Sequence, residues 1–208
     1  MATGIDSSMT GDGTIGGATR AARKPSAARA RILDTADRLF SSEGVRVVGV
    51  ERLVKESDVS RLTFYRQFPS KDELVVAYLT RRSRAEQDRV AGFRADRPGD
   101  PRAVMRDIVA AMRADFSAPG FRGCPFINVA AEFADGSSAV RETIASHRDW
   151  YRETMRQLAT EIGASDPEAA ADDLVMLRDG AMVSGYLGDA DGAAAALTRA
   201  GRTVVARL

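Results

Sequence analysis

The fold is decided by one stretch of the chain, residues 59–74, which reads Val59-Ser60-Arg61-Leu62-Thr63-Phe64-Tyr65-Arg66-Gln67-Phe68-Pro69-Ser70-Lys71-Asp72-Glu73-Leu74. A short helix with a polar face is predicted from Ser60 to Gln67, and Pro69 ends it because proline cannot continue a helix. The next helix begins at a capping box, Ser70-Lys71-Asp72-Glu73, which satisfies the backbone amides of a first turn. Such a segment can lay one helix in a DNA groove while the start of the next contacts the backbone.

These residues resemble the DNA-binding head of the TetR family of transcriptional regulators, whose usual pattern is Gly-Val-Ser-x-Gly-Thr-Leu-Tyr-x-x-Phe-x-x-Lys-x-x-Leu. The chain keeps seven residues of that pattern: Val59, Ser60, Thr63, Tyr65, Phe68, Lys71 and Leu74. It departs from the pattern at Asp58, Leu62 and Phe64. Aspartate tolerates the left-handed turn that a glycine usually makes there, so we expect the fold to survive. Leu62 adds an apolar side chain that could contact a thymine methyl.

In a helix-turn-helix, the N-terminal residues of the second helix reach the base edges. Arg61 is the best candidate for a guanine, since its fork matches the O6 and N7 acceptors. The resemblance implies that Thr63, Tyr65 and Lys71 hold the DNA backbone, and that arginines such as Arg66 vary with the operator. The predicted DNA-binding residues are Ser60, Arg61, Leu62, Thr63, Tyr65, Arg66 and Lys71. The alternative is an ordinary helical hairpin with a solvated basic face.

The predicted second helix, from about Val50 to Ser57, begins in an unusual way. The family usually starts this helix on Ser or Thr, which caps it and contacts phosphate, whereas this chain has Val48-Gly49. We expect a weaker cap and no such phosphate contact. Arg46 and Arg52 could compensate electrostatically or could simply be solvated.

Helical periodicity continues through the rest of the chain, and no segment alternates with the period of a strand. The fold class is therefore predicted to be all-α: an N-terminal three-helix helix-turn-helix domain followed by a helical effector-binding and dimerisation domain. Further helices are predicted over residues 26–44, 70–94, 102–117, 125–134, 138–163, 167–187 and 191–207. The predicted parts are a disordered arm (1–25), the DNA-binding domain (26–70), a connecting helix (71–97) and the effector domain (98–208), after the linker Pro98-Gly99-Asp100-Pro101.

Composition limits the possible functions. The chain has 208 residues, 44% of them hydrophobic, a net charge of +1 and one cysteine. No apolar run is long enough to span a membrane, and the N-terminus lacks the order of a signal peptide, so we expect a cytoplasmic protein. Gly11-Asp12-Gly13-Thr14-Ile15-Gly16 matches the dinucleotide fingerprint by chance, because no strand precedes it. Residues 26–94 carry 14 Lys and Arg against 10 Asp and Glu, a small excess that would mean little without the motif.

The C-terminal half offers a candidate effector pocket. Methionines and aromatic residues form stripes on several predicted helices, and such stripes are usually core. The functional alternative is an adaptable cavity for a small apolar effector, with Asn128 as the polar group that orients it. The segment from Phe121 to Asn128 resembles a loop and helix found in one subset of the family. The candidate pocket residues are Met105, Met112, Phe116, Phe121, Cys124, Phe126, Asn128, Trp150 and Met155.

Other reactive groups are sparse. Cys124 could sense oxidants, but the chain has no second cysteine to resolve an oxidised one. His147 is the only histidine, and the charged residues Arg148 and Asp149 beside it suggest exposure. We therefore expect no catalytic residues, metal or cofactor, and no enzyme. The run Asp189-Ala190-Asp191-Gly192 resembles the start of a calcium loop but lacks the closing glutamate.

The last two helices are predicted to form a dimer surface, because small residues three and four apart allow close helix approach. The resemblance implies a four-helix bundle between two subunits, and a palindromic operator requires a dimer. The alternative is that these residues pack only within one chain. The candidate dimerisation residues are Leu177, Ala181, Ser184, Gly185, Leu197 and Val204. The sequence thus predicts a homodimeric regulator of double-stranded DNA that acts as a repressor. The alternative is a helical protein-interaction module or a small-molecule-binding protein, either of which would bind no duplex.

Overall fold

The computed structural model describes residues 26–134 and 138–206. That part of the chain forms nine helices and no strand, which confirms the predicted all-α class. The predicted arm, with its chance match to the dinucleotide fingerprint, lies outside the described residues. Across the described ranges, no helix is both long enough and apolar enough to cross a membrane.

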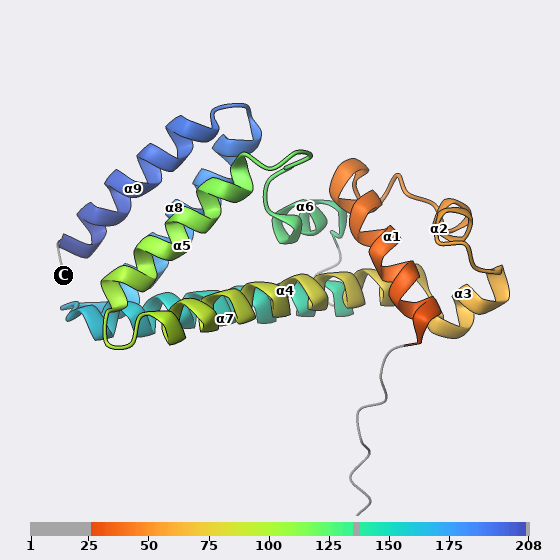
Figure 1. Cartoon of the computed structure of the whole chain (residues 1–208), viewed down its shortest axis with the longest axis horizontal. Coiled ribbons are helices and arrows are strands. Elements are labelled where there is room, and N and C mark those ends of the chain that lie inside the picture. The colour runs from red at the N-terminus through yellow and green to blue at the C-terminus, as the bar shows by residue number, and fades with distance from the viewer. Residues whose placement is uncertain (1–25, 135–137, 207–208) are drawn as a thin grey trace, which may run out of the picture.

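Three short helices form the head of the molecule: α1 (Ala27–Glu43), α2 (Val50–Glu56) and α3 (Arg61–Gln67). They gather at one end, clear of the C-terminal helices (Figure 1). The hydroxyl of Ser26 accepts a hydrogen bond from the amide of Arg29 and so caps α1. The predicted helices thus occur in the predicted order, and the differences are confined to one or two terminal residues.

Helix α4 (Lys71–Asp96) connects the head to the body. Its first turn is fixed by the predicted cap, because the Ser70 hydroxyl accepts a hydrogen bond from the Glu73 amide at 3.1 Å. The first half packs against α1, and the second half runs beside α7 (Ala139–Ile162). One continuous helix therefore reaches from the end of the head into the C-terminal body.

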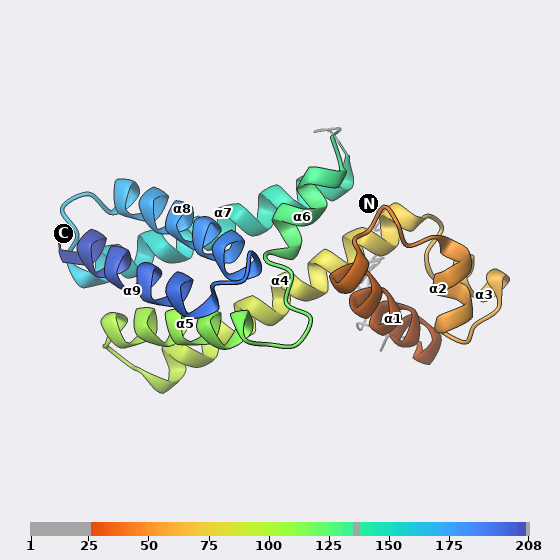
Figure 2. The same ribbon diagram turned by 90° about the horizontal axis from the view of Figure 1, so that it is seen from above.

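The body adds four more helices around α4 and α7: α5 (Pro101–Phe116), α6 (Pro125–Glu132), α8 (Pro167–Tyr186) and α9 (Ala190–Ala206). Helices α5 and α8 each begin with an Asp cap followed by proline, an arrangement that favours a helix start. Helix α8 packs against both α7 and α9, and α5 packs against α9 (Figure 2). Helix α6 lies between the body and α1 (Figure 2).

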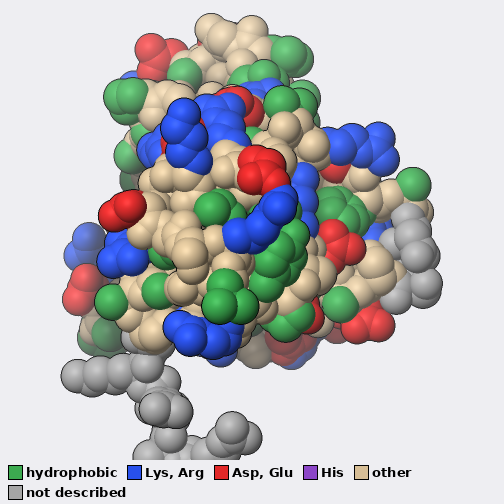
Figure 3. Space-filling view, turned by 90° about the vertical axis from the view of Figure 1, so that its right-hand side faces the viewer, with side chains coloured by type: hydrophobic (Ala, Val, Ile, Leu, Met, Phe, Trp, Pro, Cys, Tyr) green, Lys and Arg blue, Asp and Glu red, His purple; other side chains and the backbone are tan. Residues whose placement is uncertain are grey.

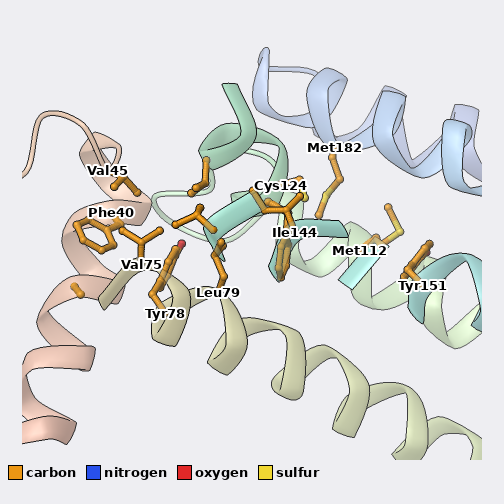
Figure 4. Close-up of a cluster of buried hydrophobic side chains, with 14 of the residues drawn as sticks. Phe40, Val45, Val75, Tyr78, Leu79, Met112, Cys124, Ile144, Tyr151 and Met182 are labelled. Carbon is orange, nitrogen blue, oxygen red and sulfur yellow. The ribbon is translucent and has the colours of Figure 1, made fainter. Parts of the chain in front are cut away.

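The head and the body share one hydrophobic core. Phe40 of α1 packs edge-on against Tyr78 of α4, with ring centroids 5.5 Å apart. Figure 4 shows the same cluster continuing past Leu79 to Cys124 and Met182. Because buried side chains pack at near-crystalline density, a movement in one half is felt in the other.

One glycine of α8 is required by packing. A Cβ built at Gly185 would lie 2.9 Å from Cγ and 3.0 Å from Cδ1 of the Phe116 ring on α5, closer than carbon atoms normally approach. The ring cannot easily withdraw, since Phe116 is itself buried. Gly92 of α4 has no such neighbour within 4 Å and is exposed.

We predict that Gly185→Ala destabilises the protein, whereas Gly92→Ala is neutral or stabilising. Alanine is favoured over glycine in a helix by about 0.5–1 kcal/mol, and overpacking at Gly185 costs about 1–3 kcal/mol. Urea unfolding of the two variants beside the parent measures the difference. Equal stability of the two variants would contradict the close contact with Phe116.

Candidate nucleic-acid interface and effector cavity

The start of α3 presents its side chains to solvent. Ser60 caps the helix: its hydroxyl accepts a hydrogen bond from the Thr63 amide at 3.1 Å and lies 2.9 Å from the Thr63 hydroxyl. Leu62 is 78% exposed and Tyr65 43% exposed. A leucine that exposed contributes little to the core, so its side chain is available to a partner. Phe64 and Phe68 face inward and are buried in the core.

The cationic groups of the candidate interface differ in their surroundings. Arg61 pairs with Glu51 of α2, and both side chains are exposed. An exposed pair contributes only about 0–1 kcal/mol, so a phosphate or a base can displace Glu51 at little cost. Arg66 is exposed. Partial burial lowers the pKa of Lys71, partly opposed by Glu132, and a phosphate oxygen beside it would favour its charged form.

Helix α3 is held against α1 by polar contacts. The Arg29 guanidinium donates a hydrogen bond to the carbonyl of Gln67 at 2.7 Å and lies over the Phe68 ring, 4.1 Å from its centroid. At the other end of α3, Arg31 donates to the carbonyl of Asp58 at 3.2 Å. Asp58 has a φ of 50°, as predicted for the turn between α2 and α3. Helix α3 is therefore held at its C-terminal end and at the turn that precedes it.

Helix α2 starts on Gly49, which makes no side-chain capping bond, as the sequence predicted. Arg52 is not simply solvated: its guanidinium donates to the carboxylates of Glu43 and Glu56. These hydrogen bonds raise the pKa of Arg52 and hold its charge within the head. Figure 3, which faces the head end of the molecule, shows Lys and Arg side chains in separate places with Asp and Glu between them.

A cavity of about 570 Å³ lies between the head and the body. Helices α1, α4, α6 and α8 and the loop before α6 contribute its lining. Of the nine predicted pocket residues, Phe121, Phe126 and Asn128 line it, and the Asn128 side chain donates a hydrogen bond to the Arg122 carbonyl at 2.8 Å. The other six do not line this cavity and belong to the hydrophobic core or pack against it: Met105, Met112, Phe116, Cys124, Trp150 and Met155.

Charged side chains line the cavity together with the apolar ones. None of these charged residues was among the predicted pocket residues. The acids are Glu43, Glu86, Asp115 and Glu132, and the cations are Arg82, Arg89, Arg122 and Arg178. Arg89 forms a two-pronged hydrogen bond to Asp115, and Arg122 donates to the Ser42 carbonyl at 2.6 Å. The cavity is therefore amphipathic rather than apolar.

The prediction that His147 is exposed was wrong: the side chain is 3% exposed. Helical spacing explains this, because His147 lies on the same face of α7 as the buried residues Ile144 and Tyr151. Its ring stacks on Phe126, with centroids 3.6 Å apart, and its Nδ1 lies 3.0 Å from the Ser83 hydroxyl. Burial, helped by Arg178 and Arg148, lowers the pKa of His147 to about 4, so the ring is neutral at pH 7.

Glu86 of α4 and Arg178 of α8 face His147 across the interior. Nε2 of His147 lies 3.5 Å from a Glu86 oxygen, and Nη2 of Arg178 lies 3.8 Å from the other. Burial raises the pKa of Glu86, although Arg178 and Arg89 oppose that shift. The sequence analysis missed both residues. The helical pattern could have indicated both, because each is a charged residue at a position of its helix that faces the interior.

Cys124, considered above as a sensor, is buried at the start of α6. Its sulfur accepts a hydrogen bond from Nη1 of Arg178 at 3.1 Å. The same nitrogen donates to Asp179 at 3.1 Å. Cys124 thus helps to hold Arg178 in place. Among the described residues, no group of three or more His, Cys, Asp or Glu could hold a metal ion.

Helix α6 contacts the head through Glu132, a third residue that was absent from the predicted site. The Glu132 carboxylate accepts hydrogen bonds from the backbone amides of Val45, at 3.2 Å, and Arg46. These amides belong to the turn between α1 and α2, so a residue of the cavity wall holds the segment from which α2 begins. Gly44 of the same turn also lines the cavity.

The predicted dimerisation residues differ in how far they are exposed to solvent. Ala181, Gly185 and Leu197 are buried within the chain, Leu177 and Val204 are partly buried, and Ser184 is exposed. The exposed apolar side chains of this region are others on α8 and at its end. They are Met176, Val183, Tyr186 and Leu187.

Comparison with known proteins covers both halves of the chain. Residues 32–78 match the family described as bacterial regulatory proteins, tetR family. Residues 100–201 match the family described as tetracyclin repressor-like, C-terminal domain. The sequence matches also include an uncharacterised HTH-type transcriptional regulator of Mycobacterium tuberculosis, 40% identical over 63 residues, or 30% of this chain. The match covers only 31% of the length of that relative.

Two solved structures are similar over most of their length. A TetR-family transcriptional regulator from Streptomyces coelicolor is 37% identical, with a TM-score of 0.82, over 86% of this chain and 94% of that chain. A putative TetR-type transcriptional regulator from Streptomyces avermitilis is 31% identical, with a TM-score of 0.77, over 87% and 97% of the two chains. The likeness therefore extends through head, connecting helix and body.

We predict that His147 makes stability depend on pH in acid. Between about pH 6.5 and pH 4 the unfolded chain protonates His147 and the folded chain does not. The free energy of unfolding therefore decreases as the pH is lowered through this range. The loss from this group is at most about 3 kcal/mol. His147→Gln should flatten the slope in that window, whatever its effect at neutral pH. Chemical denaturation at a series of pH values measures it, and an unchanged slope would contradict the prediction.

Proposed function

The chain belongs to the TetR family of bacterial transcriptional regulators, and from this premise we propose that it is a repressor released from DNA by a small effector. In this proposal two copies form a homodimer in the cytoplasm and bind a palindromic operator. The two heads then occupy successive major grooves, about 34 Å apart. The family relationship gives a transcriptional regulator with a DNA-binding helix-turn-helix, and not an enzyme.

The observation that carries the proposal is the location of the exposed large apolar side chains. In the described residues they occur in three places: Val47 in the turn after α1, Leu62 and Tyr65 on α3, and four residues of the α8 region. Exposed apolar groups that cluster indicate contact surfaces. Leu62 and Tyr65 on α3 lie among the candidate DNA contacts. The apolar surface of the α8 region suits a second subunit.

Helix α3 supports sequence-specific binding because it offers both kinds of contact that the duplex requires. We propose that Arg61 reads a guanine edge and that Leu62 contacts a thymine methyl. Ser60, Thr63, Tyr65, Arg66 and Lys71 are assigned mainly to phosphates, which fix the register of the helix. Holding α3 at its C-terminal end and at the turn that precedes it lowers the entropy lost on binding.

We predict that Arg61→Ala relaxes the sequence preference, and that Lys71→Ala weakens all duplexes alike. The first change should lose about 1–3 kcal/mol of discrimination at one base pair, and the second should lower the salt slope by about 1. Selection from a random duplex pool, followed by titrations at several salt concentrations, measures both effects. If neither variant changes affinity, the helical hairpin serves as a protein-interaction module.

The proposed dimer surface is the exposed stripe of α8. Met176, Val183 and Leu187 are spaced by seven and four residues, so they lie on one face of the helix. Two small exposed residues, Gly180 and the predicted dimerisation residue Ser184, lie on the same side of the helix. They allow close approach of a partner helix. Two such faces related by a twofold axis would bury one another.

We predict that Val183→Arg converts the dimer to a monomer, while Val47→Arg, the same change at an exposed valine of the head, does not. Arginine at the centre of an apolar contact would be buried without a partner, which should weaken association about 100-fold or more. Sedimentation equilibrium reports the mass of each variant. A parent protein that is monomeric at every concentration would refute the dimer.

Release by an effector requires a connection from the cavity to the heads. The proposed connection has two parts: the continuous helix α4, and the Glu132 carboxylate that holds the amides of Val45 and Arg46. A ligand that displaces α6 moves Glu132 and with it the turn before α2. The ligand must bind the released state more tightly than the DNA-bound state, or no shift occurs.

We predict that Glu132→Ala frees the turn between α1 and α2. The amides of Val45 and Arg46 should exchange with solvent about 10–100 times faster, because each loses its carboxylate acceptor. Hydrogen exchange followed by NMR measures each amide separately. Glu161→Ala, which removes a carboxylate of an exposed ion pair on α7, is the control. Unchanged exchange in Glu132→Ala would remove this part of the mechanism.

A further inference from the structure

We infer that the cavity between head and body binds a small organic amine, whose ammonium group hydrogen-bonds to Glu86 while its apolar body packs against Phe121, Phe126 and Met182. The inference rests on the proposed effector site and names the chemistry of its ligand. It replaces the purely apolar effector that the sequence suggested.

Among the described residues, Glu86 is the acid of the cavity wall that has no hydrogen-bond donor. Its side chain is 19% exposed and accepts no hydrogen bond from any described residue. The two nearest donors, Nε2 of His147 at 3.5 Å and Nη2 of Arg178 at 3.8 Å, stand at or beyond the limit of a hydrogen bond. Nε2 of His147 is itself buried without a hydrogen-bond partner. A carboxylate in this position is largely shielded from solvent and has no close donor among the described residues.

The other acids of the wall have hydrogen-bond donors. Glu43 accepts from Arg52, Asp115 accepts two hydrogen bonds from Arg89, and Glu132 accepts from two backbone amides. A cationic ligand would have to break those contacts to reach these three carboxylates. At Glu86 it would break no hydrogen bond, and the ion pair with Arg178 that it would meet has its charged atoms 3.8 Å apart, so the ammonium group is directed to this wall of the cavity.

Arg178 does not remove the need for a donor, and it does not make an anion site. Its Nη1 is used by Cys124 and Asp179, and the side chain is only 7% exposed. Glu86 stands beside it and repels an anionic head group. His147 is neutral at pH 7 and adds no positive charge. Because burial raises the pKa of Glu86, its charged form is poorly solvated, and a ligand ammonium would supply the missing donor.

Part of the remaining wall is apolar and accommodates an apolar body. Phe121 and Phe126 come from the loop and helix beside Glu86, and Met182 and Tyr186 come from α8. Methionine and aromatic side chains adapt to ligands of different shape. A volume of about 570 Å³ lies within the range of sites for drug-sized molecules.

Three matched compounds test the inference: 4-phenylbutylamine, 4-phenylbutanol and 4-phenylbutyrate. Trp150 is the only tryptophan, and its ring centroid lies 5.5 Å from that of His147, so its fluorescence reports binding near Glu86. Calorimetry on the full chain gives each affinity independently. We expect the amine to bind about 10- to 100-fold more tightly than the alcohol, as a hydrogen bond between charged groups allows. The carboxylate should bind most weakly.

The variants assign the effect to one residue. Glu86→Gln should abolish the preference for the amine and leave the affinity for the alcohol nearly unchanged, which also shows that the cavity is intact. Glu161→Gln makes the same change of charge outside the cavity and should keep the preference. The inference is overturned if the carboxylate binds best, if Glu86→Gln retains the preference, or if no compound binds. Operator binding is measured separately, so an amine that binds without releasing DNA refutes the release mechanism and not the ligand class.

Discussion

Burial of one helix from two sides holds the molecule together. Leu74, Val75, Tyr78 and Leu79 of α4 are almost completely buried, and the helices that cover them come from both the head and the body. A rigid helix with its first turns in one half and its last turns in the other gives the halves a fixed relation. The position of α3, and hence of the side chains proposed to read bases, therefore depends on the packing of the C-terminal body.

The cavity lies beside this shared helix, where a bound molecule can change the relation between the halves. Its wall includes Gly44 and Val45 of the head, Tyr78 and Glu86 of α4, and residues of α6 and α8. The Glu132 carboxylate adds a polar contact between the wall and the turn before α2. The coupling proposed here requires only that a ligand favour one of two arrangements of these elements.

Apolar stripes in the sequence are poor guides to the residues that line the cavity, because several of the lining residues are charged. Met112, Phe116 and Met155 fill the core, as such residues usually do. The groups that could orient a ligand, Glu86 and Arg178, are charged residues at inward positions, where burial is costly unless a partner is present. A polar residue at an inward position was the more informative signal, and His147 on α7 is a third example.

The sequence by itself determined the helices and the head, because their signals are local. The hydroxyls of Ser60 and Ser70, the proline between them and the left-handed Asp58 act within a few residues, so the recognition segment could be located in the printed chain. Only the tertiary structure decided what meets across the cavity. Glu86, His147 and Arg178 come from three helices, and Glu132 contacts amides 86 and 87 residues away. No local pattern encodes such distances, since they depend on how whole helices pack.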